Sequence, residues 1–327
     1  MMDVMFYEAF EEEEREIRKI LPEEIRAGFT PKTIQEEGAS QVPSTLISIR
    51  TQSRVPLIWA KDLKGLLTRS QGHDHVDAFR RESKAEMSCG FLGNYCARAV
   101  AEQAALMMMS LLRKLKSQEK KFMSFARDGL TGLECAGRKV LVVGVGNIGT
   151  QIVDIARGLR MDVRGVDLVE NIKDLQYVSL SEGIAWADVV LCALSLTEKT
   201  NGMLDYRAFE KARQGMVFVN VARGEISPIE DLKKLLDEGT IAAIGLDVYP
   251  QEGLLADSLR AQKPAEGPQG KILLELAKDE RVLLTPHNAF NTKEALGQKA
   301  SLTVESVISY LNKGTFPYSI PSPELEN

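Results

Sequence analysis

The sequence predicts an α/β protein made of two doubly wound parallel sheets, with a larger domain inserted into a smaller one. Three observations lead to this fold class. A glycine-rich turn joins an apolar strand to a helix near residue 144, strands and helices alternate after that turn, and a second group of short strands precedes it. Strands that alternate with helices form parallel sheets, because each crossover needs a helix on one face. With 327 residues, the chain has room for about two domains.

The glycine-rich turn has the spacing of a dinucleotide-binding turn. Lys139–Val143 is short, β-branched and apolar, as a buried parallel strand should be. Gly144, Gly146 and Gly149 follow it in the pattern G-x-G-x-x-G. The first glycine permits a tight turn, the second lets the backbone approach a pyrophosphate, and the third lets the next helix pack closely. That helix, predicted over Asn147–Leu159, would direct its positive end at the phosphates.

An aspartate after the next strand predicts which dinucleotide is bound. The strand Asp162–Val166 ends on Asp167, 18 positions after Gly149. A carboxylate at this place accepts hydrogen bonds from the ribose hydroxyls of NAD and repels the 2′-phosphate of NADP. The three positions that follow Asp167 contain no arginine that would bind such a phosphate. The sequence therefore predicts NAD as the cofactor.

The larger domain is predicted to continue as alternating strands and helices. Further strands are expected at Asp188–Ala193, Met216–Val221, Ile241–Asp247 and Arg281–Thr285. Helices are expected at Asp205–Ala212, Ile229–Glu238 and Thr292–Asn312, and one long helix at Arg98–Arg127. The run Leu106–Met109 on that long helix is predicted to pack in the core or at a subunit interface.

The smaller domain is predicted from the segment that precedes the long helix. Short strands are expected at Val4–Tyr7, Leu46–Arg50, Gly65–Thr68 and Glu86–Cys89, with helical stretches between them. Glu11–Leu21 is a charged helix whose acidic run is interpreted as a solvated face. We place the smaller domain at residues 1–94 together with 292–327, and the larger domain at residues 95–291.

Composition and charge exclude several classes of function. The net charge of −5 and the pI near 5.5 argue against a nucleic-acid-binding surface, which needs clustered basic residues. No run of about 18 apolar residues predicts a membrane span. The first residues lack the basic start and apolar core of a signal peptide. The four cysteines form no CxxC pair, so we expect reduced thiols and a cytoplasmic protein.

Three polar residues follow three strands of the larger predicted sheet. Arg223 comes after Met216–Val221, Glu252 comes after the next strand, and His287 comes after the last one. Ligands bind at the carboxyl ends of such strands. A carboxylate beside an imidazole fixes its tautomer and favours its protonated form, and an arginine binds a carboxylate through two parallel hydrogen bonds. Together with a nicotinamide cofactor, these groups suit the reduction of a 2-oxo acid.

Several segments carry a resemblance to a known family. The segments are "GVGNIG" with Asp167, "VNVARGEI", "GLDVYPQE" and "LTPHNAF", and they occur in the order seen in the D-isomer-specific 2-hydroxyacid dehydrogenases, which the chain resembles from about Val4 to Asn312. The amino-terminal segments "TRSQGHDHVD" and "NYCARAVAEQA" are also similar to motifs of that family. "PHNAF" followed by "NTKEAL" looks most like the D-lactate dehydrogenase branch.

The resemblance implies a role for each matching residue. Arg223 would bind the substrate carboxylate and carbonyl, and Glu252 would pair with His287, the acid in reduction and the base in oxidation. The substrate would also contact Gln71, Gly72, Tyr95 and Phe290. Beyond the three glycines and Asp167, the cofactor would contact Asn147, Ile148, Ala193, Ser195, Ala222 and Asp247. Ser195 stands where the family usually has proline. The smaller domain would bind the substrate and the larger one NAD, in a homodimer.

The identity of the substrate stays open at this point. Arg50 follows the strand Leu46–Ile49, where the family borders the substrate side chain, and an arginine there would favour a second anionic group. A 3-phosphoglycerate or hydroxypyruvate/glyoxylate-type dehydrogenase is therefore an alternative, whereas Phe290 favours a small apolar side chain. If the Arg50 side chain instead points to solvent, it does not contact the substrate, and the interpretation as a D-lactate dehydrogenase is preferred. The alternative that is not an enzyme is an NAD-sensing interaction protein similar to a corepressor.

His73 and His75 raise the question of a metal site. They alternate in "HDH", but the segment follows a turn-like Ser-Gln-Gly, and no cysteine or further histidine is near enough in the sequence to complete a ligand set. The sequence therefore predicts no metal.

Overall fold

The computed structural model describes residues 2–265 and 267–321, and it divides into two compact units. The first unit is the chain up to Tyr95 together with the segment from Asn291 onward, and the second unit is Cys96–Phe290. Each unit contains one parallel sheet with helices on its faces, so the predicted fold class is confirmed.

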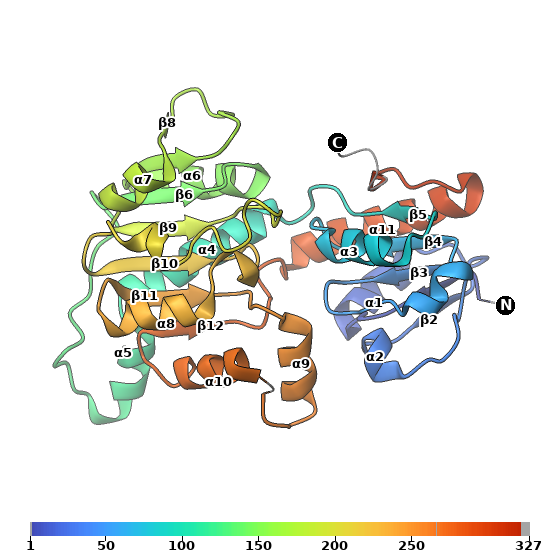
Figure 1. The fold of residues 1–327 in the computed structure, drawn as a ribbon, viewed down its shortest axis with the longest axis horizontal. Helices are drawn as coiled ribbons and strands as arrows, with labels where there is room; N and C mark the ends of the chain where they lie inside the picture. Colours follow the sequence, from blue (N-terminus) through green and yellow to red (C-terminus); the bar gives the residue numbers. More distant parts are fainter. Residues whose placement is uncertain (1, 266, 322–327) are drawn as a thin grey trace. The chain divides into compact units, whose positions relative to one another are not determined.

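The second unit is built on a parallel sheet of seven strands within the described residues. The strands are β6 (Lys139–Val143), β7 (Asp162–Val166), β8 (Gln176–Tyr177), β9 (Val189–Cys192), β10 (Met216–Asn220), β11 (Ile241–Leu246) and β12 (Val282–Leu284). Their order across the sheet is β12-β11-β10-β9-β6-β7-β8 (Figure 1). Within this unit the chain first forms β6 near the middle of the sheet and adds β7 and β8 on one side of it. It then crosses to the other side of β6 and adds β9, β10, β11 and β12 in turn. This reversal beside β6 is the place where open α/β sheets bind ligands.

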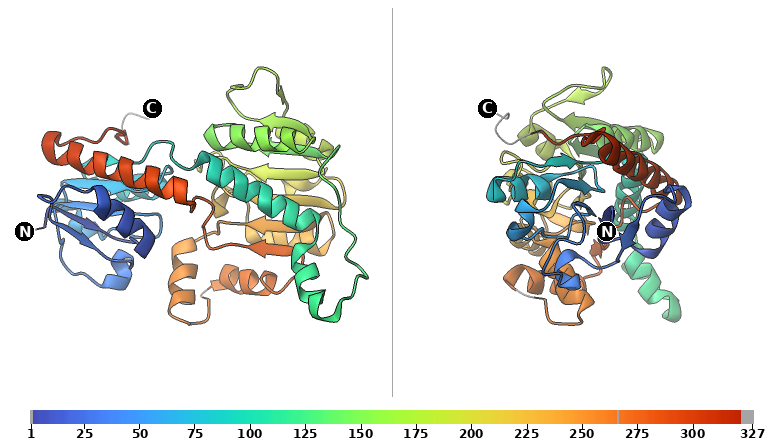
Figure 2. Two further views of the ribbon diagram at one scale, coloured as in Figure 1. Left: turned by 180° about the vertical axis from the view of Figure 1, so that it is seen from behind. Right: turned by 90° about the vertical axis from the view of Figure 1, so that its right-hand side faces the viewer.

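Helices cover both faces of this sheet. The helices of this unit are α4 (Ala97–Leu112), α5 (Leu115–Lys121), α6 (Asn147–Gly158), α7 (Leu180–Trp186), α8 (Ile229–Asp237), α9 (Glu252–Arg260) and α10 (Gly267–Leu276). Figure 1 shows α7 and α8 in front of the strands, and the view from behind in Figure 2 shows α4 and α6 on the opposite face. Burial of apolar side chains from both helix layers against the strands holds the unit together.

Two predicted helices of this unit differ from the structure. The predicted helix Arg98–Arg127 is broken, because Lys114 adopts a left-handed backbone (φ 54°) between α4 and α5, and a 3₁₀ turn η2 (Phe122–Ser124) follows. The predicted helix Asp205–Ala212 is only the short 3₁₀ turn η3 (Arg207–Phe209). In addition, no helix was predicted between the strands Ile241–Asp247 and Arg281–Thr285, where the structure forms α9 and α10.

The first unit contains a parallel sheet of five described strands in the order β2-β1-β3-β4-β5. They are β1 (Val4–Phe6), β2 (Ala27–Phe29), β3 (Leu46–Ile49), β4 (Gly65–Thr68) and β5 (Ser88–Gly90). Its helices are α1 (Glu11–Ile20), α2 (Ile34–Glu37), α3 (Asp74–Ser83) and the long α11 (Lys293–Lys313), and it contains the 3₁₀ turn η1 (Leu57–Lys61). Another 3₁₀ turn, η4 (Gly224–Ile226), belongs to the second unit. Helices α1 and α11 pack side by side (Figure 2).

The acidic run of α1 is not entirely a solvated face. Glu13, in the middle of that run, is only 1 % exposed where α1 packs against α11, whereas Glu11 and Glu12 are exposed. The prediction was wrong for Glu13, because its burial depends on partners that are distant in the sequence. Among the described residues, no helix is long and apolar enough to cross a membrane.

Candidate active site

The second unit brings Glu252 and His287 into direct contact. Nδ1 of His287 lies 2.8 Å from Oε1 and 2.9 Å from Oε2 of Glu252. Because an ionised carboxylate only accepts hydrogen bonds, Nδ1 carries the proton and Nε2 is left for a ligand. The two side chains remain 19 % and 17 % exposed, which leaves the imidazole accessible. A histidine oriented by a carboxylate in this way can transfer a proton to or from a bound molecule.

The buried carboxylate of Asp247, just after β11, holds the turn that carries His287. It accepts a hydrogen bond from the Thr285 hydroxyl, and it also accepts the backbone N–H groups of Asn288 (2.9 Å) and Ala289 (2.9 Å). His287 itself has a left-handed backbone (φ 50°), a conformation that costs free energy in a non-glycine residue. Burial raises the pKa of Asp247, and the hydrogen bonds from this turn oppose that rise. The turn and Asp247 therefore form one hydrogen-bonded unit.

The loop after β10 that carries Arg223 is fixed from within. The side chain of the buried Asn220 donates to the carbonyl of Arg223 (2.9 Å) and accepts the N–H of Ala222 (2.9 Å). The Arg223 guanidinium is half-buried and donates to the Ala222 carbonyl (2.9 Å). Gly224 allows this loop to approach the neighbouring one, because a Cβ at that position would lie 1.9 Å from the carbonyl carbon of Tyr249. The structure thus places the loop of Arg223 against the segment that leads from β11 to Glu252 at the start of α9.

The glycine-rich turn has the geometry that its spacing predicts. Gly144 has φ +92°, and a Cβ there would lie 2.7 Å from the Ala193 backbone. A Cβ on Gly149 would lie 1.9 Å from the Gly144 carbonyl oxygen, so α6 packs directly on the turn. A Cβ on Gly146 would instead enter open space, and Gly146 and Asn147 are exposed at the first turn of α6. An anion can therefore reach the N–H groups of that turn, including that of Ile148.

Asp167 lies directly after β7, next to the glycine-rich turn. Its carboxylate accepts the N–H groups of Val145 (2.6 Å) and Val169 (3.0 Å), and it is half-buried. Ala193 and Ser195 lie on the neighbouring loop after β9, where the Ser195 carbonyl accepts from Thr200 (2.7 Å). These positions are all at the carboxyl-terminal edge of the sheet.

Three of the substrate residues expected in the first unit lie after the carboxyl ends of β3 and β4. Arg50 directly follows β3, and Gln71 and Gly72 belong to the turn after β4, where Ser70 donates to the Gly72 carbonyl (2.7 Å). The backbone N–H of Arg50 donates to Glu8 (3.0 Å). Tyr95 is buried at the end of the first unit's amino-terminal segment, and Phe290 is buried at the end of the second unit.

The two remaining histidines have partners close to them in the sequence. Nδ1 of His73 lies 2.6 Å from Asp77 one turn further along α3, and Nε2 of His75 lies 2.9 Å from the Thr68 hydroxyl. Within residues 2–265 and 267–321, no group of three or more histidine, cysteine or acidic side chains is arranged to hold a metal ion.

Comparison with known proteins identifies the family. The model of the NAD-binding domain of D-isomer-specific 2-hydroxyacid dehydrogenases matches residues 105–289. The chain is 33 % identical over 258 residues to a 2-hydroxyacid dehydrogenase homolog of Haemophilus influenzae, covering 76 % of each chain. It belongs to the D-isomer-specific 2-hydroxyacid dehydrogenase family.

Named relatives and a solved structure agree with this assignment. The dehydrogenase is 30 % identical over 262 residues to D-lactate dehydrogenase of Lactiplantibacillus plantarum, covering 77 % of this chain and 76 % of the relative. Its fold is that of D-lactate dehydrogenase from Aquifex aeolicus in complex with NAD and lactic acid, with a TM-score of 0.82, 24 % identity, and coverage of 96 % and 99 % of the two chains. The predicted family, enzyme class and cofactor are therefore confirmed: the protein is an NAD-dependent 2-hydroxyacid dehydrogenase.

The structure adds positioning residues of the dehydrogenase that the sequence interpretation missed. Thr285, Asn220 and Tyr249 fix the loops of His287 and Arg223, and the Tyr249 hydroxyl donates to the Thr285 carbonyl (2.7 Å). Burial raises the pKa of Tyr249, so its hydroxyl remains a donor at neutral pH. Each of these residues stands at or just beyond a strand end, the one sequence signal that could have identified them.

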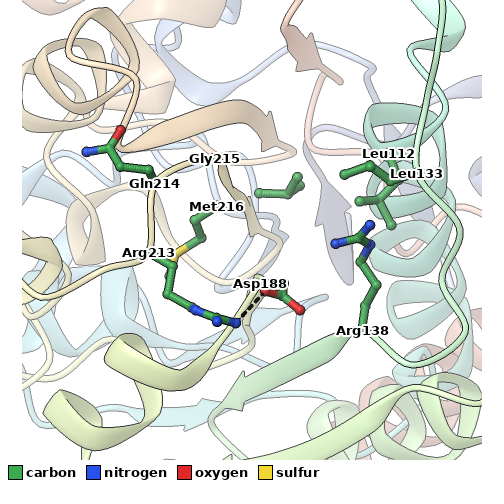
Figure 3. A pocket seen from close by; sticks show the side chains of 9 residues that line it. Leu112, Leu133, Arg138, Asp188, Arg213, Gln214, Gly215 and Met216 are labelled. Atoms are coloured by element: carbon green, nitrogen blue, oxygen red, sulfur yellow. Dashed lines mark hydrogen bonds and ion pairs between the residues drawn. The ribbon is translucent and has the colours of Figure 1, made fainter.

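A cavity of about 250 Å³ lies at the opposite edge of the dehydrogenase's seven-stranded sheet, where strands begin (Figure 3). Asp188 in this cavity pairs with Arg213 (3.0 Å) and accepts the backbone N–H of Lys139 (3.0 Å). The charge of Asp188 is thus already paired, and the cavity lies away from the carboxyl ends of the strands, where such sheets bind ligands. We assign it no part in catalysis.

Proposed function

We propose that this enzyme transfers a hydride from NADH to a 2-oxo acid and forms a D-2-hydroxy acid, as a D-lactate dehydrogenase does. The observation that carries the proposal is the hydrogen-bonded pair of His287 and Glu252, held at the carboxyl edge of an NAD-binding sheet. The D-lactate dehydrogenases among its relatives support a pyruvate-like substrate.

His287 transfers the proton in this proposal. Its Nδ1–H is held by Glu252, so Nε2–H of the imidazolium donates to the carbonyl oxygen of the 2-oxo acid as negative charge develops there. The Glu252 carboxylate stabilises the positive charge of the imidazolium before the transfer. In the direction of oxidation, neutral Nε2 removes the proton from the hydroxyl group of the 2-hydroxy acid.

Arg223 orients the substrate in this proposal. Its guanidinium can bind the substrate carboxylate through two parallel hydrogen bonds and polarise the adjacent carbonyl group. Asn220 already fixes the backbone of Arg223, so substrate binding loses less conformational entropy at this loop. In the first unit, the backbone of Gln71 and Gly72 would also contact the substrate carboxylate, with Tyr95 nearby. Phe290 of the second unit would border the side chain of the substrate.

NAD would be held by residues at the carboxyl edge of the seven-stranded sheet, and it supplies the hydride when bound. The exposed first turn of α6 and the open space beside Gly146 fit a pyrophosphate. We propose contacts from Gly144, Gly146, Asn147, Ile148, Gly149, Asp167, Ala193, Ser195, Ala222 and Asp247. The proposed substrate domain is residues 1–94 with 292–327, and the proposed NAD domain is residues 95–291.

An acidic 2-oxo acid is a second candidate substrate, and Arg50 is the observation that favours it. This half-buried arginine directly follows β3, and its guanidinium carbon lies 5.4 Å from the centre of the Phe10 ring. A charge-assisted contact to a second anionic group would contribute about 1.5–3 kcal/mol. Phosphohydroxypyruvate, oxaloacetate or hydroxypyruvate-type substrates would then be reduced beside pyruvate.

The test is NADH oxidation, followed by absorbance, with a panel of neutral and acidic 2-oxo acids. We expect turnover with at least one member and a D-configured product in chiral chromatography. Arg223→Ala should raise KM and lower kcat together, because the guanidinium binds both ground and transition states. The matched control is Arg207→Ala, an exposed arginine of η3. Tight NADH binding without turnover of any 2-oxo acid would contradict the proposal.

We also propose a homodimer and a cytoplasmic location. Large apolar side chains are exposed along the segment from α4 to η2: Leu106, Met109, Leu115, Phe122, Met123 and Phe125. Burial of such side chains against a second copy would remove apolar surface from water. The cytoplasm would keep the four free cysteines reduced.

A further inference from the structure

The first unit contains a buried charge cluster, which consists of Glu13 on α1, Arg69 after β4 and Lys299 on α11. Nε of Arg69 lies 2.9 Å from Oε1 of Glu13, and Nζ of Lys299 lies 2.7 Å from the same oxygen. All three side chains are at most 1 % exposed. A cluster of three charges with so little contact with solvent requires a physical explanation, because burial of each ion costs several kcal/mol before pairing.

Lys299 is not needed to neutralise Glu13. Arg69 already provides a positive charge to Glu13, and its other nitrogens donate to the Ser48 hydroxyl (3.0 Å) and the Tyr7 carbonyl (2.6 Å). The Glu13–Arg69 pair would therefore remain intact if an apolar side chain replaced Lys299. Such replacements of buried charges are often neutral or stabilising. The charge of Lys299 is thus a cost to folding that a functional role can explain.

The Phe10 ring connects Lys299 to Arg50. Nζ of Lys299 lies 5.9 Å from the centre of this ring, and the guanidinium carbon of Arg50 lies 5.4 Å from it. Both cations are therefore near one aromatic side chain at the start of α1. Their like charges repel each other, so a charged Lys299 disfavours movement of the Arg50 guanidinium into the buried charge cluster.

We propose that Lys299 is a positioning residue that keeps the Arg50 guanidinium directed at a second anionic group of the substrate, and that binding of this group is linked to protonation of Lys299. The inference rests on the proposed function and deepens it, because it assigns acidic 2-oxo acids as a substrate class of the same site. Lys299 contributes positive potential from inside the protein, where water screens it little.

The charges around Lys299 determine the direction of this linkage. Glu13 faces it from α1, Arg50 from the end of β3 and Arg69 from the end of β4. Burial is the main cause that lowers the pKa of Lys299 to about 7; Glu13 opposes this shift, and the charges of Arg50 and Arg69 contribute to it. An anion beside Arg50 offsets part of the repulsion and raises the pKa of Lys299. Binding of an acidic substrate above neutral pH should therefore take up a proton, and its affinity should fall as the pH rises.

The main experiment compares oxaloacetate with pyruvate between about pH 6 and pH 9, a range in which the carboxyl groups of both acids are ionised. Since protonation of His287 affects both reductions alike, the ratio of their kcat/KM values isolates the second carboxylate. In the wild type this ratio should fall by about fivefold across the range, the low end of typical coupling between two binding events. Lys299→Met should make the ratio independent of pH, and Arg50→Leu should lower it at every pH. Lys313→Met, an exposed lysine at the end of α11, is the matched control.

A second measurement separates this inference from the proposed function. Calorimetric titration with tartronate, a dicarboxylate, in two buffers of different ionisation enthalpy counts the protons taken up on binding and needs no turnover. We expect proton uptake at about pH 8 in the wild type, none in Lys299→Met, and none when D-lactate replaces tartronate. A wild-type enzyme that reduces no 2-oxo acid contradicts the proposed function. A pH-independent ratio in the wild type, an unchanged pH dependence in Lys299→Met, or tartronate binding without proton uptake overturns the role of Lys299.

Discussion

Glu252 and His287 are 35 positions apart in the chain, yet Nδ1 of His287 lies within 2.9 Å of both carboxylate oxygens of Glu252. Glu252 is the first residue of α9, and His287 belongs to the turn after β12. A carboxylate that contacts one ring nitrogen with both oxygens fixes the ring orientation and leaves Nε2 as the reactive atom. The pair therefore predicts different consequences for the loss of the imidazole and for the loss of the carboxylate charge.

We expect His287→Ala to lower kcat by about two to four orders of magnitude, the contribution of a positioned acid–base group. Glu252→Gln keeps a side chain of the same shape but removes the negative charge that orients the imidazole through Nδ1. Its kcat should therefore also fall, but by less than that of His287→Ala, because the group that donates the proton is retained. Steady-state rates across the pH range measure both effects. Glu230→Gln, an exposed glutamate of α8, is the control, and near wild-type turnover by His287→Ala would mean that another group supplies the proton.

The second prediction concerns the choice between NADH and NADPH. Asp167 should give a strong preference for NADH, because its carboxylate would repel the 2′-phosphate of NADPH. Asp167→Asn removes the charge but retains an oxygen that can accept from the N–H groups of Val145 and Val169. The ratio of kcat/KM for NADH to kcat/KM for NADPH should therefore decrease without a large change in thermal stability. Equal use of both cofactors by the wild type would refute the assignment, and Asp162→Asn, at the exposed start of β7, is the control.

The parts of the fold that depend on local patterns were predictable from the sequence. Strands β6 and β7 have the predicted bounds, because an apolar strand, a glycine turn and a terminal aspartate are all encoded within one short segment. Helix α7 was missed although Ser179 and Glu182 form a capping box, a signal that is readable in the sequence. The break at Lys114 has no such signal, because no glycine or proline marks the left-handed position.

The candidate site divides in the same way. Arg223, Glu252 and His287 could be selected because each follows a predicted strand, and the carboxyl ends of parallel strands share one edge. The support of the His287 turn by Asp247 could not be derived, because it depends on side-chain directions at the ends of two strands. Burial of Glu13 was also beyond the sequence, since Arg69 lies 56 positions away and Lys299 is further still.

The third prediction concerns assembly. If the exposed apolar segment from α4 to η2 contacts a second copy, a charged residue introduced there would be buried at the interface. The free-energy cost of burying that charge should prevent dimer formation. Phe122 and Phe125 are 69 % and 75 % exposed, so Phe122→Asp with Phe125→Asp should leave the fold of one chain intact. Light scattering should give a dimer for the wild type and a monomer for this variant. Ile58→Asp, an exposed apolar residue of η1, is the control, and a wild-type monomer at micromolar concentration would contradict the dimer.

The last prediction concerns the stability of the buried charge cluster. Glu13→Gln leaves Arg69 and Lys299 buried without their shared carboxylate, so it should cost about 3–5 kcal/mol of unfolding free energy. Lys299→Met leaves the Glu13–Arg69 pair in place, and its effect should be neutral or stabilising. The pH dependence has a definite sign. Since the pKa of Lys299 is lowered from 10.5 to about 7, the unfolded chain binds more protons than the folded one between these values.

The cost of holding Lys299 charged is therefore fully present below pH 7 and is relieved as the pH rises toward 10.5. Relative to Lys299→Met, the wild type should gain stability between about pH 7 and pH 9, whereas Lys313→Met should follow the wild type. Urea unfolding monitored by circular dichroism at each pH measures this difference. Parallel pH profiles for the wild type and Lys299→Met would show that Lys299 keeps an ordinary pKa in the folded protein, and a Glu13→Gln variant as stable as the wild type would show that Glu13 does not hold the two cations in place.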